Sequence, residues 1–246
     1  MIRRSTAASR SGYWTPVKLT PPGELKRKIE AKLFMQLVTT DSEAALAEAK
    51  ATRIAAQRLA EVGQTFIHSN PEKAFETAET LFSISPGAAD GTIQLTYGGC
   101  LSDTIADESP GEIYHFLTGL SAKDPARTLE MILPGTPDPP NSGTFSFLTN
   151  TWAESDLLAF TGWVNRQTDP LIREPSARLI ASRLAGKQQY AEALDWAMSL
   201  SAPQNNMPNS IYREWSQSNP QQAQAWLKSA KLPADRRAFL EKGGPQ

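Results

Sequence analysis

The chain has 246 residues, of which 40% are hydrophobic and 21% are charged, and its formal net charge is −1. This composition supplies enough apolar material for a sizeable core and excludes a wholly disordered chain. A single cysteine excludes an internal disulfide, and two widely separated histidines give no metal-ligand spacing. No segment is apolar for long enough to cross a membrane. We therefore expect a chain without cofactor or metal ion, and a cytoplasmic location is favoured.

The first 22 residues predict a disordered basic arm. No acidic residue precedes Glu24, and residues 1–40 hold eight Lys or Arg against two Asp or Glu, a charge of +6. The remaining residues carry 17 basic against 24 acidic side chains, a charge of −7. An Arg- and Ser-rich start also fits an organelle transit peptide, or a tail left after removal of an anchor. Trp14 is expected to hold the arm against the folded part.

Helix-start signals then recur along the chain. Asp, Asn and Ser accept hydrogen bonds from the free N–H groups of a first turn, and Pro suits the next position. Such signals predict helices beginning within about two residues of Asn70, Ser109, Asp124, Asp156 and Asn219. Glu112 and Gln222, three residues after Ser109 and Asn219, predict capping boxes. The 18 prolines are expected at such starts and in loops, outside helix interiors.

The starts recur at intervals close to thirty residues. The marks are Asp41, Asn70, Ser109, Asp124, Asp156, Gln189 and Asn219, with intervals of 29, 39, 15, 32, 33 and 30 residues. A small residue often follows four positions after a mark, as Ala45, Ala74, Ala193 and Ala223, and a large one seven positions after it, as Phe116, Met131, Trp163, Trp196 and Trp226. This pattern predicts an all-α fold, a right-handed helical-hairpin solenoid of about 30–33-residue repeats with essentially no strands.

Two tryptophan pairs flank these marks at equal spacing. Trp152 and Trp163 are eleven residues apart, as are Trp215 and Trp226, and a cap residue lies between the members of each pair. The two rings of a pair are therefore expected on the two arms of one hairpin, packed into a shared interior. A stacking surface for sugars or peptides is the alternative interpretation of these rings.

The Ala-then-Trp helix with an Asp/Asn-Pro start resembles the tandem α/α repeats of the tetratricopeptide-like superfamily. It is also similar to degenerate Trp and Asp-Pro repeat arrays of uncharacterised bacterial proteins. The resemblance spans residues 41–240, although the Trp-Leu-Gly-Tyr signature of tetratricopeptide repeats is absent. It implies an interaction scaffold and transfers no catalytic residue.

Proline and glycine divide the expected array. Residues 133–144 contain four prolines and two glycines, which predicts a linker or long loop. The array is accordingly expected in two parts, residues 23–132 and the Trp-rich residues 145–241. Residues 91–99, the one stretch that resembles a strand, are interpreted as helix.

The residue types that carry catalysis are sparse. Cys100 is interpreted as a small buried thiol, since neither His68 nor His115 is near it in sequence. Glu154 and the Asp107–Glu108 pair are carboxylates that a glycan hydrolase would use as acids. A non-enzymatic scaffold for protein or peptide partners is the leading hypothesis, and a small helical glycan hydrolase acting through Glu154 or Glu108 is the alternative.

An acidic stretch is the candidate partner site. No basic residue lies between Lys73 and Lys123, and this stretch should repel nucleic acid. We expect a basic segment, from another protein or from the chain's own arm, to dock on Asp103, Asp107, Glu108 and Glu112. A solvated acidic face is the alternative interpretation.

Overall fold

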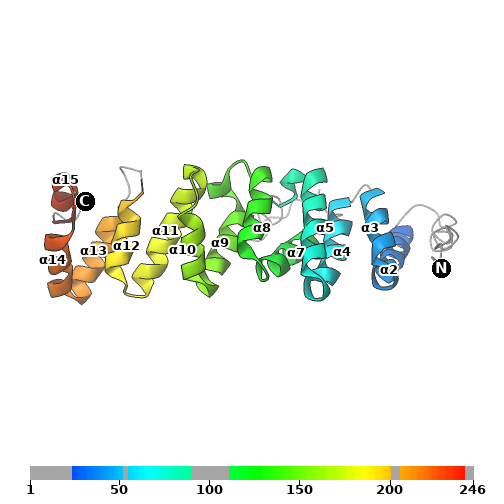
Figure 1. Cartoon of the computed structure of the whole chain (residues 1–246), viewed down its shortest axis with the longest axis horizontal. Coiled ribbons are helices and arrows are strands. Elements are labelled where there is room, and N and C mark those ends of the chain that lie inside the picture. The colour runs from blue at the N-terminus through cyan, green and yellow to red at the C-terminus, as the bar shows by residue number, and fades with distance from the viewer. Residues whose placement is uncertain (1–23, 52–54, 90–110, 201–205, 242–246) are drawn as a thin grey trace, which may run out of the picture. The chain divides into compact units, whose positions relative to one another are not determined.

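The computed structural model describes residues 24–51, 55–89, 111–200 and 206–241. Throughout these ranges the regular structure is α-helix with short 3-10 turns and no strand, which confirms the all-α prediction (Figure 1). Trp14, Cys100 and residues 91–99 lie outside the described ranges, so the expectations for them stay predictions. The chain divides into two compact units, residues 1–123 and 124–246.

Unit 1 is built from helices that pack on their neighbours in the chain. They are α2 (Glu24–Thr40), α3 (Ser42–Ala51), α4 (Ala55–Ser69), α5 (Pro71–Ile84) and α7 (Gly111–Ser121), with a 3-10 turn η1 (Pro86–Ala89) after α5. α3 packs against α2 and α4, and α4 packs against α5 and α7. Phe34, Leu59, Leu81 and Phe116 are almost completely buried and form its core.

Unit 2 repeats this neighbour-to-neighbour arrangement. It contains α8 (Pro125–Ile132), η2 (Leu133–Gly135), η3 (Pro139–Asn141), α9 (Gly143–Ser155), α10 (Leu157–Val164), α11 (Pro170–Gly186), α12 (Tyr190–Met198), α13 (Met207–Ser218), α14 (Pro220–Ser229) and α15 (Ala234–Glu241). From α8 to α14 each helix packs against the next, and α15 packs against α13. α9 also contacts α11, the second helix after it. The core of unit 2 is therefore formed mainly by contacts between helices that are neighbours in the sequence.

A single residue joins two helices at several corners. The Asp156 N–H donates to Trp152 O at 2.8 Å, while its Oδ1 accepts from the Ala159 N–H at 2.9 Å. Asn219 repeats the arrangement, donating to Trp215 O at 2.7 Å and accepting from the Gln222 N–H at 3.2 Å. One residue thus satisfies the last turn of one helix and the first turn of the next.

The predicted helix starts are confirmed wherever the structure describes them. Asn70, Asp124, Asp156 and Asn219 each cap a helix that begins at the following residue. Ser109 lies outside the described ranges, and the described part of α7 begins at Gly111. At Asn219 the reciprocal half of the capping box does not form, because its N–H already donates to the preceding helix.

Small buried residues let the helices approach at these corners, as predicted. The side chains four residues after a mark are fully buried at Ala45, Ala74, Ala193 and Ala223. In unit 1 two glycines do the same between α4 and α7: a Cβ on Gly63 would lie 2.2 Å from the Phe116 ring, and one on Gly119 would lie 2.3 Å from Ile67. Glycine is therefore required at position 63, where three atoms of the buried Phe116 ring lie within 2.8 Å, whereas at position 119 only the end of the Ile67 side chain would have to move.

Proline placement departs from the expectation in one helix. Pro175 lies inside α11 as the sixth residue of the helix, and not in a loop. A proline there has no N–H to donate to Leu171 O, so one hydrogen bond of the helix is lost. α11 continues because it is held by packing against α9, α10 and α12.

The Pro-rich residues 133–144 fold onto unit 2. They contain the single turns η2 and η3, and η3 contacts both α9 and α11. Pro139 and Thr136 are buried, and Ser142 then caps α9 by accepting from the Phe145 N–H at 3.3 Å. Within the described ranges, none of the helices is both long and apolar enough to cross a membrane.

Candidate functional site

The tryptophan pairs of unit 2 fill the interiors of two corners. Trp152 and Trp163 lie with ring centroids 5.7 Å apart and planes at 51°, and Trp215 and Trp226 lie 5.8 Å apart at 53°. The near-identical values follow from the same eleven-residue spacing about a cap residue. The prediction that each pair packs into a shared interior is confirmed. Trp226 nevertheless remains half-buried, whereas Trp163 is fully buried.

A third corner, between α11 and α12, is built differently. Here the turn consists of Lys187, Gln188 and Gln189, and Gln188 has a left-handed φ of 61°. The Gln189 N–H donates to Leu184 O at 2.9 Å, and the Gln188 N–H donates to Ala185 O at 2.8 Å. This is the hydrogen-bond pattern of a Schellman motif. At this corner Gln189 therefore donates to the main-chain oxygen of a leucine, whereas Asp156 and Asn219 donate to that of a tryptophan.

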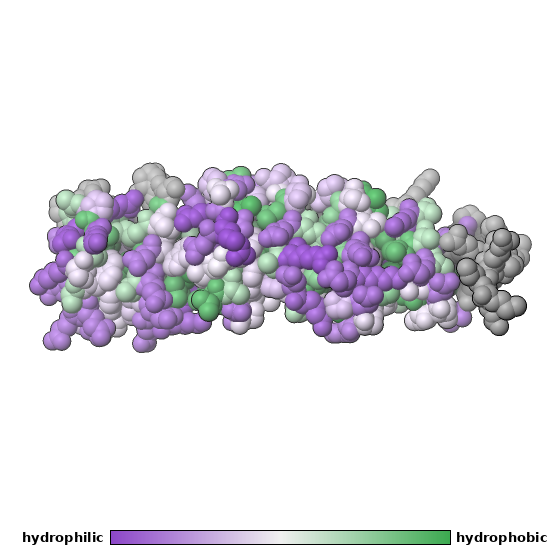
Figure 2. Space-filling view, viewed as in Figure 1, coloured by the Kyte–Doolittle hydropathy of each residue, from purple (hydrophilic) through white to green (hydrophobic). Residues whose placement is uncertain are grey.

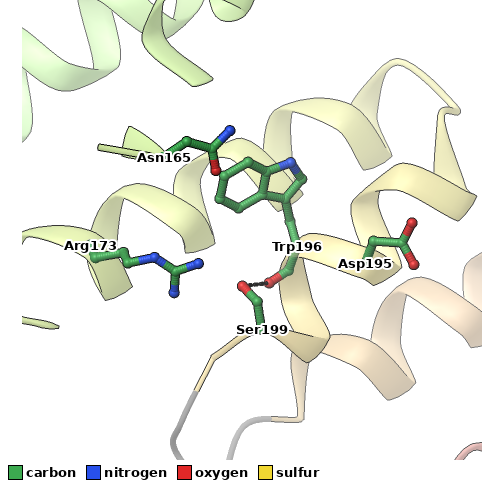
Figure 3. A pocket seen from close by; sticks show the side chains of 5 residues that line it. All are labelled: Asn165, Arg173, Asp195, Trp196 and Ser199. Carbon is green, nitrogen blue, oxygen red and sulfur yellow. Dashed lines mark hydrogen bonds between the residues drawn. The ribbon is translucent and has the colours of Figure 1, made fainter. Parts of the chain in front are cut away.

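Without a tryptophan across the corner, the indole of Trp196 has no aromatic partner. Each of the other four tryptophans of unit 2 contacts at least one further ring. Trp196 is half-buried and makes no ring or cation contact with the other described residues. It lines an open depression between the end of α10, α11 and α12 (Figure 3). The depression has a volume of about 190 Å³ and is lined by Asn165, Arg173, Asp195, Trp196 and Ser199.

The polar groups of this depression come from three helices. Asn165 is the C-cap of α10 and is exposed, while Arg173 projects from the first turns of α11 and is half-buried. Ser199, the C-cap of α12, donates its hydroxyl hydrogen to Trp196 O at 2.8 Å, the bond drawn in Figure 3. The guanidinium of Arg173 and the carboxylate of Asp195 lie on opposite sides of Trp196 in that view.

Three of these side chains have unused binding capacity. Among the residues that the structure describes, the Arg173 guanidinium, the Asn165 amide and the Trp196 indole N–H have no hydrogen-bond or ion-pair partner. Guanidinium binds carboxylate through paired N–H groups, a primary amide both donates and accepts, and an indole face accepts apolar or planar groups. This combination suits recognition of a ligand, and it contains no nucleophile with an adjacent base.

The structure reaches one member of the predicted acidic site. Asp103, Asp107 and Glu108 lie outside the described residues. Glu112 is half-buried on α7, and its Oε2 and main-chain oxygen accept from Gln64 Nε2 of α4 at 3.4 and 3.1 Å. Its carboxylate therefore takes part in the packing of α7 on α4.

The alternative catalytic carboxylate lies at the surface. Glu154 is in the last turn of α9 with 75% of its side chain exposed, and its Oε2 is 3.9 Å from Arg183 Nη2. The buried environment of a general acid is absent around it. His68 and His115 are both exposed, and the described residues hold no cluster of three or more His, Cys, Asp or Glu side chains that would bind a metal ion.

Comparison with known proteins identified no relative. No family model, curated protein or solved structure matches the chain.

Sequence reasoning assigned Trp196 to the core with the other tryptophans and did not single out Arg173. One signal distinguishes Trp196: the position eleven residues earlier is Ala185, whereas Trp163 and Trp226 have a tryptophan there. The unpaired state of Arg173 had no signal in the sequence, because ion pairing depends on which helices become neighbours.

Proposed function

We propose that this chain is a non-enzymatic helical-repeat scaffold that binds a protein or peptide partner. The observation that carries the proposal is the recurring helix–cap–helix corner, with the same hydrogen bonds at Asp156 and Asn219. Packing of each helix on its neighbours is the arrangement of a helical-hairpin solenoid, and such arrays commonly present binding surfaces along their repeats.

A repeat of about 30–33 residues accounts for the spacing of the corners. Within unit 2 the marks Asp124, Asp156, Gln189 and Asn219 follow one another at 32, 33 and 30 residues. Each mark is followed at once by a short helix, and the longer α9, α11 and α13 precede the last three. The contact between α9 and α11 matches the stacking of equivalent helices in successive repeats.

The openness and small volume of the depression beside Trp196 favour partner binding over an enclosed reaction site. The face of the molecule in Figure 2 is mainly hydrophilic, with hydrophobic residues in small separate groups. The depression beside Trp196 is open and smaller than the roughly 300–1,000 Å³ of pockets that enclose small molecules. It suits one or two side chains of a larger partner.

Hydrogen exchange tests the repeat architecture. In Trp226→Ala we expect loss of amide protection mainly after residue 175, because repeats contact chiefly their neighbours. Trp226→Phe, which retains a ring, is the control and should keep most of the protection. Uniform loss from residue 41 onward would instead indicate one cooperative core and contradict the repeat proposal.

Peptide display tests the scaffold function. A random peptide library is selected on the immobilised full chain, and retained peptides are resynthesised and titrated against the protein in solution. We expect a related set of peptides that compete with one another for binding. The proposal fails if none binds in solution, or if the protein releases sugars from a glycan panel and Glu154→Gln abolishes that release.

A further inference from the structure

The depression beside Trp196 combines an indole that has no ring partner among the described residues with polar groups that are open to a ligand. Within the described part of the chain, the Trp196 indole of α12 has no ring contact, the Arg173 guanidinium of α11 has no ion pair, and the Asn165 amide at the end of α10 has no hydrogen bond. By comparison, the Trp163 ring packs on Trp152 and Phe160, and the Arg183 guanidinium lies beside Asn150 and Glu154.

Half-burial makes the unpaired state of Arg173 informative. A fully exposed guanidinium is satisfied by water, but one partly enclosed by protein loses some of that hydration and gains from an anion placed against it. Asp195, the acidic side chain of the lining, lies across Trp196 from it (Figure 3). Among the described residues, no carboxylate forms an ion pair with the Arg173 guanidinium.

From this geometry we infer that the depression is a docking site for a peptide segment in which a carboxylate adjoins an apolar or aromatic side chain. The carboxylate pairs with Arg173, the neighbouring side chain lies on the face of Trp196, and the Asn165 amide bonds to the peptide backbone. The source of the carboxylate is either an Asp or Glu side chain or the C-terminus of the partner. This inference rests on the proposed scaffold function and specifies the chemistry of the partner.

The test uses short synthetic peptides and the full ¹⁵N-labelled chain. One peptide carries Phe-Asp in its interior with both ends blocked, a second ends in Phe with a free C-terminal carboxylate, and a third replaces Phe-Asp by Phe-Asn with both ends blocked. Arginine Nε–H and indole N–H signals are followed by NMR up to millimolar peptide. The signals of Arg173 and Trp196 are assigned from the spectra of Arg173→Gln and Trp196→Phe.

We expect at least one carboxylate peptide to shift both signals and to bind about tenfold or more tightly than the Phe-Asn peptide, the range of a hydrogen-bonded charge pair. Arg173→Gln should remove this preference. Arg178→Gln is the matched control, because Arg178 is an exposed arginine of the same helix outside the depression, and it should retain the preference. Which carboxylate peptide binds more tightly identifies the source.

The inference is overturned if neither carboxylate peptide exceeds the neutral one, or if Arg173→Gln keeps the preference. Binding of the peptides from the display selection shows whether the docking site alone is wrong or the scaffold function is wrong as well. If they bind wild type and Arg173→Gln equally, the scaffold function stands and the docking site is wrong. If none binds, both are wrong.

Discussion

The corner between α9 and α10 and the corner between α13 and α14 use the same local design with different degrees of burial. Their caps and tryptophan pairs agree in hydrogen bonding and in ring geometry. Yet Trp163 is fully buried and stacks on Phe160, whereas Trp226 is half-buried and its ring is tilted against that of Tyr212. α10 packs against both α9 and α11, whereas the main contact of α14 is with α13. Local sequence thus sets corner geometry, and the number of neighbouring helices sets burial.

The largest expected difference between these corners lies in the cost of removing the second tryptophan. Trp163→Ala should lower the free energy of unfolding by about 3–5 kcal/mol, because it empties a fully buried site. Trp226→Ala should cost about 1–2 kcal/mol, because part of its ring already contacts water. Urea denaturation followed by circular dichroism measures both, with the Phe variants as ring-retaining controls. Equal losses would mean that the ring–ring contact, and not burial, determines stability.

Removing the cap residue should lower the free energy of unfolding equally at the two corners, although removing the tryptophan should not. Asp156→Ala and Asn219→Ala are each expected to cost about 1 kcal/mol, since each removes one side-chain acceptor at an exposed corner. Asp156→Asn and Asn219→Asp keep the acceptor and serve as controls with much smaller losses. The same denaturation measurement applies. A cap effect that differs between the corners as much as the tryptophan effect would contradict the separation of local geometry from burial.

The smallest expected change in stability is at the corner between α11 and α12, where a substitution should stabilise the protein. Gln188→Gly should raise the free energy of unfolding by up to about 1 kcal/mol, because Gln188 has a left-handed φ of 61° that glycine adopts without strain. Thermal unfolding detects this as a higher midpoint. Gln188→Ala keeps a Cβ and should give no such gain, so a similar rise in both variants would rule out relief of backbone strain.

Much of the local architecture was predictable because its causes are short-range. Asn70, Asp124, Asp156 and Asn219 could be read as caps, since a side-chain oxygen and a following helix turn are enough to define that role. The buried alanines and the shared interiors of the tryptophan pairs follow from spacing about the caps. The prediction that prolines lie outside helix interiors was wrong for Pro175. A helix interior tolerates proline only when packing against other helices compensates for the lost hydrogen bond, and that packing cannot be read from local sequence.

The sequence by itself determined that this chain is helical, where its corner helices begin, and which aromatic rings face each other across a corner. These properties depend on hydrogen bonds and spacings within about a dozen residues. Only the tertiary structure decided that Trp226 stays half-buried, that Glu112 joins the packing of α7 on α4, and that Trp196 and Arg173 share an open depression. Burial and pairing of charged side chains depend on which helices become neighbours, and that is a property of the assembled core.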